Sequence, residues 1–121
     1  MASVKYIVIA MILFLTACSS KTETAPRLDL EYEVTGGRGV MHYVYANSDE
    51  NTEKKEFRKI ARSLCRGKDI CIVMFWNDKS LMPENNAPLS EDNVESKVAH
   101  YNINKHKGYD RLAICAVESC W

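Results

Sequence analysis

Apolar and polar residues alternate between Leu28 and Val34, and this alternation predicts a strand. Every second residue there is apolar, and the residues between them are acidic. A period of two is typical of a half-buried strand. Residues 40–46 are rich in β-branched and aromatic side chains, which predicts a second strand. The glycine-rich residues 35–39 lie between the two and predict a turn, so we expect a β-hairpin.

A helical period follows the predicted hairpin. Acidic residues precede it, Gly67 follows it, and its apolar residues recur three and four positions apart, which predicts one buried helix face. The residues of this face are Phe57, Ile60, Ala61, Leu64 and Cys65. Residues 70–76 are continuously apolar and predict a central strand that is covered on both faces.

The last third of the chain predicts one more helix and one more strand. Residues 77–89 contain two prolines and indicate a loop, after which Ser90 is a typical helix N-cap. The buried stripe of this helix would be Val94, Val98 and Tyr101, with a loop over 102–110 and a strand over 112–117. The predicted order is β-β-α-β-α-β. We therefore expect an α+β fold with a small mixed sheet of about four strands and two helices on one face.

The first residues of the chain have the pattern of an export signal. Lys5 precedes an unbroken apolar run over residues 6–15. A span of the bilayer needs roughly 20 such residues, so the run fits the core of a signal peptide better than a membrane helix. The sequence Leu15-Thr16-Ala17-Cys18 follows, and it resembles the lipobox of bacterial lipoproteins.

This resemblance implies a cellular location and a division of the chain into segments. In lipoproteins the cysteine thiol receives a diacylglycerol, cleavage before it removes the signal peptide, and the new amino group is acylated too. We expect a signal peptide over residues 1–17, lipid attachment such as palmitate at Cys18, a flexible tether over 18–27 and a periplasmic domain over 28–121. Ser19, where an inner-membrane lipoprotein would have Asp, favours the periplasmic face of the outer membrane in the cell envelope.

Four cysteines follow Cys18, and in an exported chain an even number predicts two disulfides. They are Cys65, Cys71, Cys115 and Cys120. Zinc sites use pairs spaced from C-x2-C to C-x4-C, whereas the first pair here is C-x5-C and the second C-x4-C. An oxidising compartment also disfavours a thiolate cluster, so we expect disulfides and no metal. Four cysteines allow three connectivities. We favour the two local pairs, and the sequence leaves a long-range bridge such as Cys65–Cys115 open.

Charge and motifs argue against several functions. The chain has 16 basic and 16 acidic residues, so removal of Lys5 with the signal leaves about −1 and no excess that would hold nucleic acid. His42, His100 and His106 lack the spacing of a metal pair, and no hydrolase motif occurs. We therefore predict a protein that is not an enzyme and has no cofactor.

Two segments could form a partner surface. The C-x5-C-x-V-x-F-W run that begins at Cys65 and the A-x-Y-N-x-N run that begins at Ala99 resemble motifs of small bacterial domains of unknown function. They contain Trp and Tyr residues, which are enriched at binding hot spots, together with asparagines. The predicted surface comprises Trp76, Tyr101, Asn104 and Tyr109.

The sequence leaves two functions open. The favoured one is a non-enzymatic lipoprotein that presents a small binding or accessory domain to an envelope protein. The alternative is an immunity or inhibitor lipoprotein that neutralises a toxin, a lysozyme-like enzyme or a phage. Small size, a lipid anchor and disulfides suit both.

Overall fold

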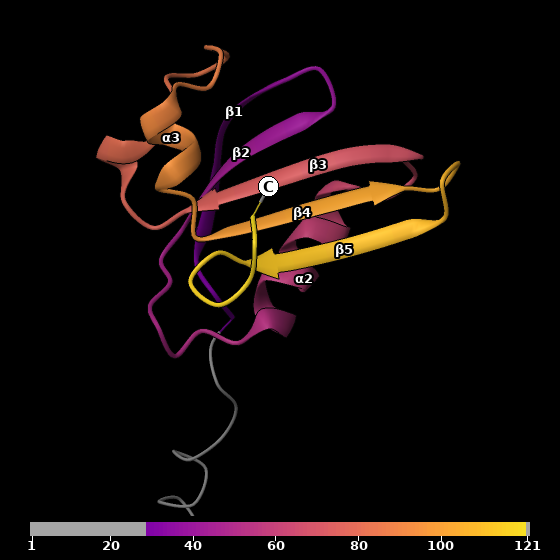
Figure 1. Ribbon diagram of the computed structural model, residues 1–121, viewed down its shortest axis with the longest axis horizontal. Coiled ribbons are helices and arrows are strands. Elements are labelled where there is room, and N and C mark those ends of the chain that lie inside the picture. Colours follow the sequence, from indigo (N-terminus) through magenta and orange to yellow (C-terminus); the bar gives the residue numbers. More distant parts are fainter. Residues whose placement is uncertain (1–28, 121) are drawn as a thin grey trace, which may run out of the picture.

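A five-stranded sheet organises residues 29–120, the part of the chain that the computed structural model describes (Figure 1). The expectations for Cys18, the signal peptide and residues 19–27 of the tether lie outside these residues. The strands lie side by side in chain order: β1 (Tyr32–Arg38), β2 (Met41–Ala46), β3 (Ile70–Trp76), β4 (Ala99–Asn104) and β5 (Tyr109–Ile114). β2 and β3 are parallel, and the other neighbours are antiparallel. The predicted α+β class and mixed sheet are confirmed.

The predicted order of elements is wrong after residue 95. Helix α3 (Glu91–Glu95) has the predicted Ser90 cap, whose hydroxyl accepts the N–H of Asn93 at 3.1 Å, but the helix is short. Residues 99–104 are strand β4, so the sheet has five strands instead of about four. The apolar residues of this segment fit either period. Pairing of β4 with both β3 and β5, which sequence spacing does not show, selects the strand.

The hairpin and the last strand are shifted from their predicted positions. β1 begins at Tyr32 and continues through the expected turn to Arg38, with an irregular register between Val34 and Gly36. The glycines serve a close approach there, because a Cβ on Gly36 would overlap the backbone carbonyl of Asn85. At the other end of the chain, β5 covers 109–114 instead of 112–117.

Helix α2 (Lys54–Leu64) covers one face of the sheet. Glu53 caps it and shares a capping box with Glu56. The predicted apolar stripe is confirmed: Phe57 is 3% exposed, and its ring meets Phe75 of β3 edge to face at 5.1 Å. The sheet residues that pack in this cluster include Val44, Val73, Tyr101 and Leu112.

Part of the second face of the sheet is covered by a loop and by α3. Tyr43, Met74 and Trp76 are buried there, and Met82 and Leu89 of the segment after β3 pack against them. The indole N–H of Trp76 donates to the carbonyl of Asn93 at 2.9 Å, which places α3 on this side. Figure 1 shows α2 behind the strands and α3 near the end of β3. The expectation of two helices on one face is therefore wrong, because alternating side chains of β3 need cover on both faces.

Both disulfides join the local pairs. Cys65–Cys71 ties the end of α2 to β3, with Cα atoms 5.7 Å apart, and Cys115–Cys120 closes the chain after β5, with Cα atoms 5.1 Å apart. The sheet, α2, both apolar clusters and both bridges are formed by residues 29–120, so this part of the chain holds a complete core. Over the same residues, no helix combines the length and hydropathy that a membrane crossing requires.

Candidate functional site

The four residues predicted as one partner surface lie in three different places. Trp76 is fully buried on the second face, and Tyr101 is fully buried under α2 on the first. The prediction of a single surface is therefore wrong for these two, because residues that alternate along strands project to opposite faces. Asn104 and Tyr109 are register partners at neighbouring ends of β4 and β5. Only this second pair lies together on accessible surface.

Asn104 and Tyr109 belong to a part of the second face that neither the loop nor α3 covers. Register places Ile70 beside Asn104 and Tyr109, and Ile72 beside Asn102 and Arg111. Ile70 and Tyr109 are each 41% exposed. Figure 1 shows this part of β3, β4 and β5 toward the viewer, on the side away from α3. We call the following residues the open face: Ile70, Ile72, Asn102, Asn104, Tyr109 and Arg111.

The covering loop stops short of the open face because three hydrogen bonds fix it elsewhere. The carbonyl of Asn85 accepts the N–H of Gly37 at 3.2 Å, and the carbonyl of Ala87 accepts the hydroxyl of Tyr43 at 2.9 Å. The indole of Trp76 holds α3 in the same way. These contacts bind residues 77–95 over β1, β2 and the end of β3, so the opposite ends of β3, β4 and β5 stay accessible.

The open face has the chemistry of a contact surface. It combines two aliphatic side chains, a tyrosine and two amides, and an amide can both donate and accept hydrogen bonds. The side-chain oxygen of Asn104 also accepts the backbone N–H of Lys107 at 3.1 Å, which orders the adjoining turn. Tyrosine and arginine are enriched where proteins bind partners. The arrangement suits recognition, and it holds no nucleophile with an adjacent base.

Two basic side chains, Lys97 and His100, are buried near the start of β4, beside the C-terminal disulfide loop. Lys97 is 5% exposed and His100 is 6% exposed, and the Lys97 ammonium lies 2.8 Å from Nδ1 of His100. Lys97 also donates to the carbonyl of Cys120 at 3.2 Å. Burial, with the charges of Lys97 and Arg111, lowers the pKa of His100 to about 4, and burial lowers the pKa of Lys97. A neutral imidazole can accept the ammonium hydrogen bond, so the pair fixes the C-terminal disulfide loop.

Sequence reasoning missed the role of Lys97. It considered His100 only as a metal ligand and placed it near a helix end. The structure instead places His100 in β4, on the second face, opposite Ala113 of β5. No sequence signal marks the pair, because the partner of Lys97 depends on where the C-terminal loop returns over the sheet.

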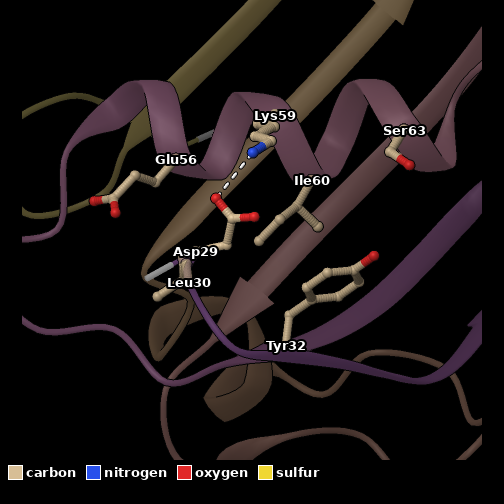
Figure 2. A pocket seen from close by; sticks show the side chains of 7 residues that line it. All are labelled: Asp29, Leu30, Tyr32, Glu56, Lys59, Ile60 and Ser63. Atoms are coloured by element: carbon tan, nitrogen blue, oxygen red, sulfur yellow. Dashed lines mark hydrogen bonds and ion pairs between the residues drawn. The ribbon is translucent and has the colours of Figure 1, made fainter. Parts of the chain in front are cut away.

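Two hollows lie at the other end of the domain from the open face. Figure 2 shows the smaller, of about 200 Å³, between α2 and the approach to β1; Leu30, Tyr32 and Ile60 line it, and the Asp29–Lys59 ion pair, at 2.9 Å, crosses it. The larger, of about 530 Å³, lies near the ends of β3 and β5, with Phe57 and Val117 among its apolar lining. Its polar lining comprises Ser48, Asp49, Glu50, Thr52, Asn77, Glu95 and Lys97.

Metal-binding side chains do not gather in either hollow. Over residues 29–120, no three His, Cys, Asp or Glu residues lie close enough to hold one ion. All four cysteines in this part of the chain are in disulfides, so none offers a thiol. Comparisons of this chain with protein-family models, curated proteins and solved structures gave no match.

Proposed function

We propose that this protein is a non-enzymatic lipoprotein that is anchored through Cys18 in the cell envelope and presents a small binding domain. Its place would be the periplasmic face of the outer membrane, and its binding surface is the open face. The observation that carries the proposal is that Ile70 and Tyr109 stay accessible together on the second face, whereas Tyr43, Met74 and Trp76 of the same face are covered.

The lipid anchor in this proposal rests on the sequence around Cys18. A charged start, a ten-residue apolar run and all four lipobox positions agree. Two or more acyl chains would hold the protein stably, since each buried methylene contributes about 0.8 kcal/mol. Asp29, the first described residue, follows Cys18 by eleven positions. That length reaches at most roughly 36–40 Å from the anchor.

The binding role rests on the composition and exposure of the open face. Ile70 and Tyr109 are large side chains of which more than a third of the surface contacts solvent. They lie in one patch with the half-buried Ile72 and two asparagines, whereas Val94 and Val117 are exposed singly elsewhere. A partner that covers the patch would remove apolar area from water, which contributes about 25 cal/mol per Å² before the costs of association.

Intact-mass measurement tests the anchor. The protein would be purified from the membranes of bacteria that export it, alongside a Cys18→Ala variant. We expect the wild type to lack residues 1–17 and to carry a diacylglycerol on Cys18, and the variant to keep its signal peptide. An exported wild-type chain without any lipid would refute the anchor.

Site-specific photocrosslinking tests the binding surface. A photoreactive residue would replace Ile72 in one variant and Val94 in another, both in the exported full chain. Ile72 lies in the open face, and Val94, which is 39% exposed on α3, is the matched control. We expect a discrete envelope protein or lipid adduct from position 72 only. Equal labelling from both positions, or none from position 72, would contradict the assignment of the open face. A secreted toxin or lysozyme-like enzyme in the adduct would instead favour an immunity or inhibitor role.

A further inference from the structure

The topology brings three turns to one end of the sheet, beside the open face. They are the β1–β2 turn at residues 39–40, the segment 65–69 between α2 and β3, and the β4–β5 turn at residues 105–108. Backbone hydrogen bonds connect them to their neighbours: Ile72 N–H donates to Val40 at 2.9 Å, and Lys105 N–H donates to Asp69 at 2.8 Å. Segments far apart in the chain therefore form one continuous end of the domain.

This end of the domain is strongly basic. We call the following exposed residues the basic end: Arg38, Arg66, Lys68, Lys105 and Lys107. The one carboxylate in these three turns, Asp69, lies 3.6 Å from His106. Within residues 29–120, no ion pair involves Arg38, Arg66, Lys105 or Lys107. None of these four charges is therefore held in an ion pair within the described part of the chain.

The opposite end of the sheet carries the balancing acidic charge. The segments 47–53, 77–81, 90–98 and 115–120 approach it, and they contain eight acidic residues against Lys79 and Lys97. The chain as a whole is neutral, yet the folded domain has a positive and a negative end. Such a charge separation orients a protein in the field of a charged surface.

Apolar side chains project among the basic residues. Val40 is 45% exposed in the β1–β2 turn, and Ile70 and Tyr109, at the starts of β3 and β5, are each 41% exposed. Exposed apolar residues ringed by Lys and Arg are the combination that holds peripheral proteins at an anionic membrane interface. An acidic protein partner would complement the charges but would give no reason for an exposed valine at the tip of a turn.

We propose that the basic end binds the surface of a bilayer that contains anionic phospholipid. Arg38, Arg66, Lys68, Lys105 and Lys107 would contact the phosphate groups, while Val40 and Tyr109 enter the headgroup region. This inference deepens the proposed function, since it names the partner of the same end of the domain, and it rests on that binding role but not on acylation of Cys18.

The position of the chain start is compatible with this contact. Residue 29 lies at the acidic end, because β1 begins there with Tyr32 opposite Ala46. The strand β3 has seven residues, which at about 3.3 Å per residue span roughly 23 Å. The eleven residue-to-residue steps from Cys18 to Asp29, at most roughly 36–40 Å long, can therefore pass the whole sheet. The anchor and the basic end can reach one bilayer.

Vesicle cosedimentation with residues 19–121 tests the proposal without any acyl chain. This fragment contains the complete core described above, and its disulfides would be kept oxidised. We expect binding to phosphatidylcholine vesicles that contain phosphatidylglycerol, no binding to phosphatidylcholine alone, and loss of binding near 0.5 M salt, where the Debye length is only about 4 Å. Absence of binding to the anionic vesicles at low salt, or equal binding to both vesicle types, would overturn the proposal.

Matched variants locate the contact. Lys105→Gln with Lys107→Gln removes two charges from the basic end, and Lys55→Gln with Lys59→Gln removes two from exposed positions of α2, where the side chains are 77% and 70% exposed. Each Lys near an anionic surface strengthens binding roughly fivefold, so the first pair should weaken it roughly 25-fold. The second pair should change binding less than about threefold. Equal losses for the two pairs would overturn the proposal.

A second pair of variants tests the apolar contribution. Val40→Ser alters the tip of the basic end, and Val117→Ser alters a residue that is 80% exposed after β5. We expect the first to weaken vesicle binding roughly fivefold and the second to leave it unchanged. An unchanged affinity for Val40→Ser would refute insertion of this side chain. A chain that binds vesicles but proves unacylated would refute the anchor alone, whereas an acylated chain that ignores vesicles would refute this inference alone.

Discussion

Replacement of Trp76 by Ala should remove a large part of the free energy of unfolding of this domain. Trp76 is fully buried between β3 and the covering segment, and its ring meets Tyr43 edge to face at 5.9 Å. Its N–H also donates to the carbonyl of Asn93 at 2.9 Å. The substitution therefore leaves a cavity, removes an aromatic contact and frees the end of α3.

The expected loss follows from these contacts. Truncation of a buried tryptophan to alanine costs about 3–5 kcal/mol. The 92 described residues correspond to a total stability of roughly 5–14 kcal/mol. Trp76→Phe keeps most of the volume but leaves the Asn93 carbonyl without its donor, which costs roughly 1–3 kcal/mol. The free energy of unfolding should therefore be lower than in the wild type for Trp76→Phe, and lower still for Trp76→Ala.

Urea denaturation of oxidised residues 19–121, followed by far-ultraviolet circular dichroism, measures the loss. At a slope of about 1.5 kcal/mol/M, the midpoint of Trp76→Ala should fall by roughly 2–3 M. Tyr109→Ala is the matched control, because this aromatic residue is 41% exposed on the open face. Its midpoint should move by less than about 0.5 M. A Trp76→Ala midpoint within about 0.5 M of the wild type would refute the burial of Trp76 and return it to the partner surface.

Two further predictions concern His100 and Gly36. Since the pKa of His100 is lowered from 6.5 to about 4, only the unfolded state binds its proton between these values, so the free energy of unfolding should be highest above pH 6.5 and fall by up to about 3 kcal/mol toward pH 4. His100→Gln should remove this decrease in the free energy of unfolding, whereas the contribution of the carboxylates should be the same in both proteins. If the urea midpoints of the two proteins followed parallel curves against pH, the assignment to His100 would be wrong. Gly36→Ala should cost roughly 2–3 kcal/mol and expose residues 82–89 to proteolysis, because its Cβ overlaps the Asn85 carbonyl. Gly39→Ala, where no atom lies within 4 Å, should leave those residues protected, and equal cleavage of the two variants would exclude the contact as the cause.

Local patterns determined several elements of this protein. The apolar period from Phe57 to Cys65 indicated α2, because a helix buries one stripe whatever it packs against. The run over residues 70–76 indicated a strand covered on both faces, and this holds for the second half of β3, where Phe75 and Trp76 are buried on opposite faces, but not for Ile70, which is 41% exposed. The even cysteine count indicated two disulfides, and the short separations favoured the pairs that form. Each of these features depends on residues that are near one another in the chain.

Long-range pairing decided the features that the sequence misassigned. Residues 99–104 carry apolar side chains that suit a helix or a strand, and hydrogen bonding to β3 and β5 selected the strand. That pairing turned Tyr101 toward α2 and away from Trp76, so the predicted surface separated. The cover of Trp76 depended on a loop that docks on Gly37, in β1, through Asn85. The spacing of residues within the loop does not predict which strand the loop packs against.

The distribution of charge shows the same division. The sequence by itself determined the neutral total, and it is the whole basis for the predicted export signal and lipid anchor, because composition and an uninterrupted apolar run need no fold to be seen. Acidic and basic residues are mixed along the chain, so no segment of the sequence indicated a basic binding site. The tertiary structure alone gathered the basic turns at one end of the sheet and left the open face beside them. The physical reason is that strand direction, which is set by pairing between distant segments, decides at which end of a sheet each turn lies.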